Sequence, residues 1–157
     1  MRLSALPRPL LLSGVLLLAA PAGSAPAANK PTLASVEARV YDRQQGAIVT
    51  IEESSDAYGM NSDAVIVVKL QGSHEGKPLT LKLVASAPKE SSEATGDLPG
   101  WKVTQTRTLW ALSENGTTQV PFLLPYTCAS AVKVTVTLTG PGIKGSKTLD
   151  TSFPCAE

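Results

Sequence analysis

The sequence predicts an all-β protein, folded as an antiparallel β-sandwich of about eight strands. Apolar residues alternate with polar ones along most of the chain, which is the period of a half-buried strand. Turn-forming residues recur between these segments at the spacing of sandwich domains, and no segment after residue 28 carries a helical period. Two packed antiparallel sheets would bury the apolar faces of such strands.

Residues 1–28 have the pattern of a cleaved secretory signal peptide. Arg2 and Arg8 form a positive start, the run Leu10–Leu18 is apolar, and Ala25-Pro26-Ala27 offers a small-x-small cleavage site. The apolar run is roughly a dozen residues, well short of the ~20 that a membrane-spanning helix needs. We therefore expect a secreted or periplasmic protein with no membrane span after cleavage.

The remaining chain, residues 29–157, has the length of one domain. The net charge of +1 includes Arg2 and Arg8, so the mature chain carries a net charge of −1. No basic stripe directs it to nucleic acid or acidic lipid, and we expect neither as a partner.

The segment from Cys128 to Cys155 predicts a closed hairpin. Its first half alternates valine with lysine or threonine, and Gly140-Pro141-Gly142 is a turn in which Pro and Gly take the two corners. Folding about Pro141–Gly142 predicts three strand pairs, Val134–Leu149, Val132–Thr151 and Ser130–Phe153. The same register places Cys128 opposite Cys155, which predicts a disulfide on the core side of an exported domain.

The first half of the domain predicts two further hairpins. A turn near Gln44–Gln45 would place Val40 opposite Val49 and Ala38 opposite Ile51. The segment 64–70 is apolar on both faces over four residues, which indicates a central strand covered on more than one side. A second hairpin would pair it with the segment 79–85, in the register Ile66–Leu83, Val68–Leu81 and Leu70–Leu79.

A long loop and one more hairpin are predicted in the second half. Residues 86–100 are rich in Ser, Glu, Pro and Gly without a period, which indicates a loop. Strands at 101–112 and 117–124 flank Asn115-Gly116, a strong type I′ turn signal. This hairpin would place Leu109 opposite Phe122 and Ala111 opposite Val120.

The order of the last strands resembles the C-terminal half of bacterial immunoglobulin-like and fibronectin-like modules. The likeness lies in the succession of a Gly turn, an apolar strand with Pro, a corner, a long Thr/Val strand and a final strand, over roughly the last 55 residues. It implies an immunoglobulin-like sandwich. The Cys…Trp…Cys spacing of immunoglobulins is absent, so the disulfide is expected within one sheet.

Catalytic chemistry has little support in the sequence. His74 is the single histidine, and it lies in a turn between two predicted strands, where nothing would orient its ring to activate a nucleophile. Phosphate-binding loops, metalloprotease motifs and nucleophile elbows are also missing. We therefore expect no enzyme and no cofactor.

An acidic loop offers a possible calcium site. Its oxygen ligands are Glu52, Glu53, Asp56 and Asp63, whose hard carboxylates suit Ca²⁺. Their spacing does not match an EF-hand, so a solvated acidic loop is the alternative. Tyr58 lies in the same loop as a possible contact residue.

The two tryptophans fall on opposite faces of one predicted strand. Trp101 shares its face with apolar residues and is expected in the core, whereas Trp110 points outward. An outward Trp110 could stack on a sugar or anchor a protein partner, or the 86–100 loop could cover it.

These observations predict an exported, non-enzymatic β-sandwich that binds another envelope or extracellular protein, or serves as a structural component. The alternative is a carbohydrate-binding or Ca²⁺-dependent adhesion module centred on Trp110 or on the acidic loop. The sequence leaves the oligomeric state open.

Overall fold

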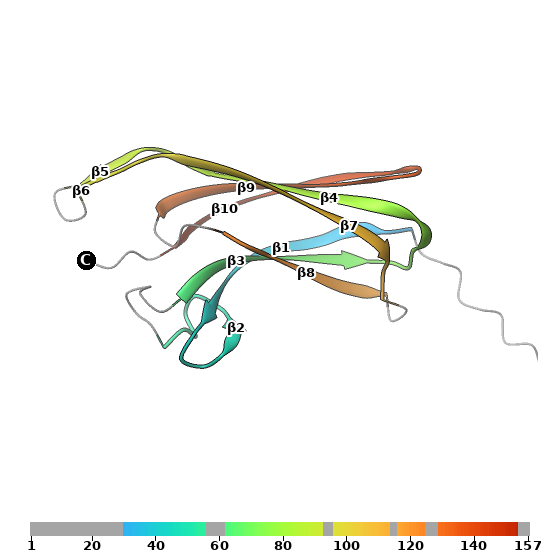
Figure 1. Cartoon of the computed structure of the whole chain (residues 1–157), viewed down its shortest axis with the longest axis horizontal. Helices are drawn as coiled ribbons and strands as arrows, with labels where there is room; N and C mark the ends of the chain where they lie inside the picture. Colours follow the sequence, from blue (N-terminus) through green and yellow to red (C-terminus); the bar gives the residue numbers. More distant parts are fainter. Residues whose placement is uncertain (1–29, 56–61, 93–95, 114–115, 125–128, 154–157) are drawn as a thin grey trace, which may run out of the picture.

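A computed structural model describes residues 30–55, 62–92, 96–113, 116–124 and 129–153 (Figure 1). These residues form β-strands, turns and bends, with no helix among them. Their ten strands are β1 (Thr32–Asp42), β2 (Ala47–Val49), β3 (Ser62–Gln71), β4 (Glu75–Ala87), β5 (Glu90–Ser92), β6 (Gly96–Leu98), β7 (Trp101–Ala111), β8 (Thr117–Leu123), β9 (Ala129–Gly140) and β10 (Ile143–Phe153).

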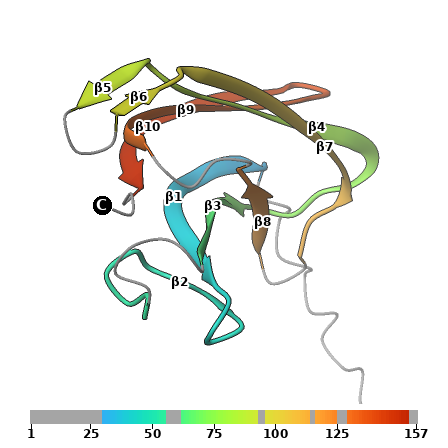
Figure 2. The same cartoon turned by 60° about the vertical axis from the view of Figure 1, so that its left-hand side comes forward.

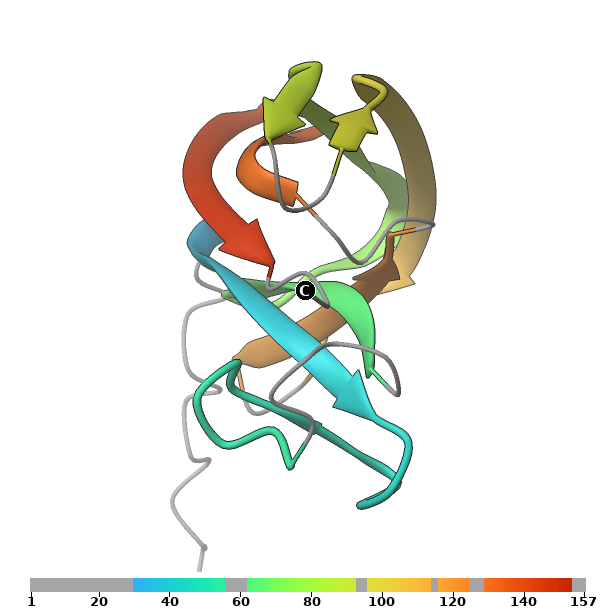
Figure 3. The ribbon, with the colours of Figure 1, turned by 90° about the vertical axis from the view of Figure 1, so that its left-hand side faces the viewer.

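Eight of the strands form two antiparallel four-stranded sheets, as predicted for a β-sandwich, and β5 and β6 form a separate two-stranded sheet. The first sheet has the order β2-β1-β3-β8 and the second the order β10-β9-β4-β7. The second sheet arches over the first in Figure 2, and Figure 3 shows the two layers end-on. The core between them is aliphatic apart from Phe122 and Phe153, and its central strands are β3, β4 and β9.

The C-terminal hairpin has the predicted register over most of its length. Val134 pairs with Leu149 and Val132 with Thr151, and Gly142 takes the positive φ of 67° that the turn requires. Beyond Thr151 the register shifts, so that Phe153 pairs with Ala129 and the predicted pairing with Ser130 is wrong. Ala129 is buried there, which moves the inward side from even to odd positions. Cys128 and Cys155 lie outside the described residues, and their disulfide stays a prediction.

The predicted hairpin between β3 and β4 is wrong, because these strands belong to different sheets. Ile66, Val68 and Leu70 are fully buried on β3, and so are Leu79, Leu81 and Leu83 on β4. The alternation correctly indicated which side chains point inward. It could not indicate that the two strands stack across the core instead of pairing edge to edge.

The predicted hairpin between β7 and β8 is wrong for the same reason. Leu109 pairs with Leu79 of β4, and Phe122 pairs with Ile66 of β3. Gly116 does take a positive φ, but the turn joins the two sheets. Pro121 has no N–H to donate, which fits its place in β8, an edge strand with one neighbour.

The first hairpin is confirmed near its turn, where Val40 pairs with Val49. However, β2 ends at Val49, and Ile51 lies in a turn, so the predicted pairing of Ala38 with Ile51 does not form. Ala38 pairs instead with Ile66 of β3.

The segment 86–100 contains a short arm, which corrects the prediction of an irregular loop. β4 continues to Ala87, and β5 and β6 extend the hairpin of β4 and β7 beyond the sandwich (Figure 1). Glu90 anchors the arm, because its carboxylate accepts hydrogen bonds from the backbone N–H groups of Ser130 (3.3 Å) and Ala131 (3.2 Å). A hydrogen bond from the Ser130 side chain contributes most to lowering the pKa of Glu90 below its usual value, and the two backbone N–H groups lower it further.

Side chains bridge the two long sides of the sandwich, where β7 faces β8 and β10 faces β1. On one side Gln105 Nε2 of β7 donates to the carbonyl oxygen of Leu123 at 2.5 Å, and the Arg107 guanidinium lies 5.5 Å from the centre of the Phe122 ring. On the other side Lys147 Nζ donates to the carbonyl oxygen of Ala34 at 3.0 Å. Both long sides of the sandwich are therefore bridged.

We predict that Gly100→Ala destabilises the domain at the base of the arm. An added Cβ would lie 2.8 Å from the backbone nitrogen of Lys89, too close without a backbone shift. Urea denaturation should show a loss of roughly 1–3 kcal/mol in the free energy of unfolding. The control is Gly145→Ala, whose Cβ would lie 3.8 Å from Leu33 and should change stability by less than about 0.5 kcal/mol. Equal effects of the two substitutions would contradict the close approach at Gly100.

Candidate functional site

The outer face of the first sheet carries a patch of apolar side chains. The outward positions of its strands are joined across the sheet by the register, which pairs Arg39 with Val65, Val65 with Leu123 and Val67 with Pro121. Ile48 of β2 pairs with Tyr41 beside them. We call this set the apolar face; its members are Tyr41, Ile48, Val65, Val67, Pro121 and Leu123.

The apolar face includes two side chains of β3 that are as buried as core residues. Val65 is 0% exposed and Val67 is 6% exposed, although both point away from the core between the sheets. An antiparallel sheet usually presents polar side chains on its solvent side, and burial on both faces is typical of a covered strand. The prediction that the segment 64–70 is a central strand covered on more than one side is therefore confirmed.

Around these valines lie exposed apolar side chains. Four large hydrophobic side chains are exposed among the described residues, and three of them lie on the apolar face, namely Leu123 (56%), Ile48 (46%) and Tyr41 (37%). A shallow groove of about 330 Å³ crosses all four strands of the sheet. Its apolar lining consists of Ile48, Val67 and Pro121, and polar side chains of Glu37, Arg39, Lys69 and Gln119 complete it.

The polar part of this groove is a connected ion-pair network. The Glu37 carboxylate lies 2.7 Å from Lys69 Nζ and 2.8 Å from Arg39 Nη2, and it accepts a hydrogen bond from Ser35 Oγ at 2.9 Å. These bonds, from Lys69 first and then from Arg39 and Ser35, lower the pKa of Glu37 from 4.5 to about 2. Glu37 therefore pairs with both cations, and the network keeps a net charge of +1 beside an apolar surface.

Asp42 fixes the end of β1 that carries Tyr41. Its side chain is fully buried and accepts hydrogen bonds from the backbone N–H groups of Gln44 (2.8 Å), Gln45 (3.0 Å) and Ser55 (2.8 Å). The Ser55 hydroxyl donates as well, at 2.6 Å, and this bond contributes most to lowering the pKa of Asp42 far below its usual value. The carboxylate thus holds the β1–β2 turn and the segment after β2 in place.

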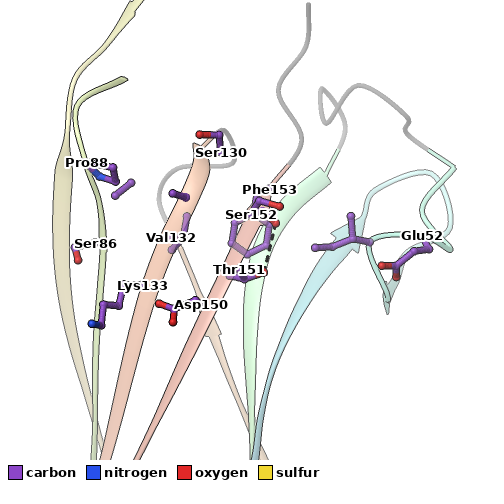
Figure 4. A pocket seen from close by; sticks show the side chains of 13 residues that line it. Glu52, Ser86, Pro88, Ser130, Val132, Lys133, Asp150, Thr151, Ser152 and Phe153 are labelled. Atoms are coloured by element: carbon purple, nitrogen blue, oxygen red, sulfur yellow. Dashed lines mark hydrogen bonds between the residues drawn. The ribbon is translucent and has the colours of Figure 1, made fainter. Parts of the chain in front are cut away.

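A second, more open groove of about 1310 Å³ lies at the end of the sandwich near the arm (Figure 4). Strands β4, β9 and β10 and the turn after β2 contribute to it, with Ser86, Ser130, Lys133, Asp150, Thr151 and Glu52 among the polar residues. Its described lining includes no histidine or cysteine that could act with these hydroxyls as a base or nucleophile.

The predicted orientations of the two tryptophans, Trp101 inward and Trp110 outward, are confirmed. Trp101 is half-buried and packs against the core, whereas Trp110 is 64% exposed on the outer face of the second sheet. The arm, which replaces the expected loop, therefore does not cover Trp110.

The predicted calcium ligands are partly engaged elsewhere. Asp63 forms an ion pair with Arg43 at 2.7 Å, and Glu53 accepts hydrogen bonds from the N–H and hydroxyl of Thr50, while Glu52 is exposed. No group of three or more potential metal ligands occurs within the described ranges. Asp56 and Tyr58 lie outside those ranges, so the calcium site and the Tyr58 contact stay predictions.

Comparison with known proteins gives no assignment: no protein-family model, curated protein or solved structure matches the chain. Within the described residues no helix is long and apolar enough to cross a membrane. The function must therefore be argued from the surfaces described above.

The sequence predicted the buried valines of the apolar face but not the other residues that surround them. The run Val65-Ile66-Val67-Val68 signalled a strand with two buried faces, but Tyr41, Ile48 and Leu123 each looked like ordinary outward residues of separate strands. Their meeting depends on the sheet order β2-β1-β3-β8, which the alternation does not determine.

We predict that Glu37 makes stability depend on acid pH. Because the folded-state pKa of Glu37 is depressed, its contribution is fully present above pH 4.5 and is lost as the pH falls toward about 2. Urea denaturation at pH 7, 4.5, 3 and 2 should show Glu37→Gln less stable than wild type by about 1 kcal/mol at pH 7, with the gap closing by pH 2. Glu75→Gln, which removes an exposed carboxylate of β4, is the control and should leave no such gap.

We also predict that Asp42→Ala loosens the β1–β2 turn. The substitution leaves the N–H groups of Gln44, Gln45 and Ser55 without their acceptor. Amide hydrogen exchange followed by NMR should accelerate by at least about tenfold at Gln45 and Ser55. Glu53→Ala, which removes an exposed carboxylate bonded only locally to Thr50, should not accelerate exchange at Gln45; the same acceleration in both variants would argue against a specific role for Asp42.

Proposed function

We propose that the protein is an exported, non-enzymatic, immunoglobulin-like β-sandwich that binds another envelope or extracellular protein through the apolar face. The observation that carries the proposal is the exposure of Tyr41, Ile48 and Leu123 around Val65 and Val67 on the outward side of β3. Grouped apolar side chains on a solvent-facing sheet are typical of protein interaction sites.

The composition of the apolar face favours a protein partner. Protein interfaces have an apolar centre with polar groups at the rim, and tyrosine and arginine are enriched in them. Here Val67, Ile48 and Pro121 supply the apolar part of a groove that Glu37, Arg39 and Lys69 border. Glu37 pairs with both Arg39 and Lys69, so the network keeps a net charge of +1, and a partner that covers it would be favoured by a carboxylate or carbonyl oxygen at this position.

The strand order supports the immunoglobulin-like character. In the constant-type arrangement the strands A, B, E and D form one sheet and C, F and G the other. With β1, β3, β4, β8, β9 and β10 taken as A, B, C, E, F and G, the sheets contain A-B-E and G-F-C in that order. The strand between C and E in the chain is β7. It lies beside β4 in the second sheet, whereas strand D of the constant-type arrangement lies in the first sheet.

The surroundings of His74 support a non-enzymatic role. The ring Nε2 lies within hydrogen-bond distance of the carbonyl oxygen of Lys77, inside the same turn. The backbone carbonyl of His74 accepts the N–H of Leu112 at 3.0 Å. Both contacts fit a histidine that stabilises the start of β4, since neither involves a hydroxyl that the ring could activate.

We expect Leu123→Lys to weaken partner binding. Leu123 lies at the edge of the apolar face and is 56% exposed. The Leu123→Lys variant should therefore fold normally, but its lysine would place a charge in the interface. Partners are to be isolated from the native envelope and medium with tagged mature protein, identified by mass spectrometry, and purified for titration. The dissociation constant should rise by at least about tenfold.

The matched control is Ala111→Lys, which adds the same charge at an exposed position of β7 in the other sheet. It should leave the dissociation constant within about twofold. Partner binding that survives both Leu123→Lys and Ile48→Lys would exclude the apolar face as the interface. A rise in the dissociation constant for Ala111→Lys as large as that for Leu123→Lys would exclude it as well.

A further inference from the structure

The outer face of the second sheet is a regular array of threonine and lysine. The register aligns its outward positions in four rows across β7, β4, β9 and β10. We call this array the Thr/Lys face; its rows are Thr108–Thr80–Thr139–Lys144, Thr106–Lys82–Thr137–Ser146, Thr104–Val84–Thr135–Thr148 and Lys102–Ser86–Lys133–Asp150. It is the upper surface of the molecule in Figures 1 and 2.

Hydroxyl groups repeat on this face at short intervals. Neighbouring strands lie roughly 4.8 Å apart, and successive rows are separated by about 6.8 Å along each strand. The face therefore presents many hydroxyl donors and acceptors over a continuous surface. Threonine also favours strands, so the array alone would not indicate a ligand.

The distribution of charge is the second observation. The four rows contain Lys82, Lys102, Lys133 and Lys144 but a single acidic residue, Asp150. None of these lysines forms an ion pair with a residue that the structure describes, whereas the charges on the apolar face are paired. The four lysines against Asp150 give these rows a net charge of +3, in a chain whose net charge is −1 after signal removal.

Trp110 is the third observation. It has the same outward phase on β7 as Thr104, Thr106 and Thr108, so it lies at the end of the Thr/Lys face. At 64% exposed, it is the most exposed of the large hydrophobic side chains among the described residues. An exposed indole offers a flat apolar surface on which a sugar ring can stack.

We propose that the Thr/Lys face binds an acidic polysaccharide. In this arrangement the lysines bind carboxylate or sulfate groups, the threonine hydroxyls hydrogen-bond to sugar hydroxyls, and Trp110 stacks against one sugar ring. The site is separate from the apolar face, because the two lie on opposite outer surfaces of the sandwich.

The residue types favour a polysaccharide over other anionic ligands. Strong phosphate binding, as to nucleic acid, usually employs arginine for its bidentate contacts, and the four rows contain none. Binding at a membrane surface is strengthened by apolar side chains that insert among lipids, and Val84 is the single aliphatic side chain in the rows. A hydroxyl-rich surface with dispersed lysines and one aromatic ring matches a hydroxylated, acidic polymer.

The test is titration of the mature protein with defined acidic polysaccharides, namely polygalacturonate, alginate, hyaluronan and chondroitin sulfate, with dextran as the neutral comparison. At least one acidic polymer should bind, dextran should not, and binding should weaken with added salt. Lys102→Gln/Lys133→Gln should raise the dissociation constant by about tenfold, and Trp110→Ala by about fivefold.

The matched control is Lys30→Gln/Arg43→Gln, which removes two positive charges at exposed positions outside the Thr/Lys face. It should change the dissociation constant by less than about twofold. Failure of all four acidic polymers to bind would overturn the proposal. An equal rise in the dissociation constant for the two double variants would overturn it too. Tighter binding to single-stranded DNA or to phosphatidylglycerol vesicles than to any polysaccharide would also overturn it, in favour of a phosphate ligand. None of these outcomes depends on the apolar face.

Discussion

The fold depends on the burial of two apolar strand faces against each other. The inward residues of β3 and of the central part of β4 are almost completely buried, and the two strands lie in different sheets. Pairing them edge to edge would leave one side of both strands uncovered, whereas stacking them buries both. Once β3 and β4 are stacked, β1 and β8 flank the first, and β9 and β7 flank the second.

Alternation and turn chemistry determined different parts of the fold. Alternation identified the inward residues of β3, β4 and β9 correctly, because it reflects only the pleat of each strand. The tight turn at Pro141–Gly142 also determined which strands pair, since a turn this short leaves no alternative neighbour. The connections from β3 to β4 and from β7 to β8 contain similar turn residues but join the two sheets. Turn residues show where a strand ends; they do not determine the sheet in which the next one begins.

The candidate surfaces differ in how far the sequence could reveal them. The Thr-x-Thr repeats of β7 and β9 and the outward phase of Trp110 can be read within single strands. The apolar face and the Glu37–Lys69 ion pair bring together residues of β1, β2, β3 and β8 that are distant in the sequence. Their assembly required the sheet order. The bulge near Ala129 was equally hidden, because a one-residue shift within a strand leaves little trace in its composition.

The two outer faces have different chemistry, and the architecture keeps them apart. A sandwich places its outer surfaces on opposite sides of one rigid core, so ligands on the two faces need not compete. The first sheet presents Tyr41, Ile48, Leu123 and paired charges, which suit a contact with another folded protein. The second presents hydroxyls, Trp110 and lysines that form no ion pair with the described part of the chain, which suit a hydrated, charged polymer. With both proposed ligands bound, the domain would hold a protein partner against an acidic matrix, and each contact would raise the effective concentration of the other.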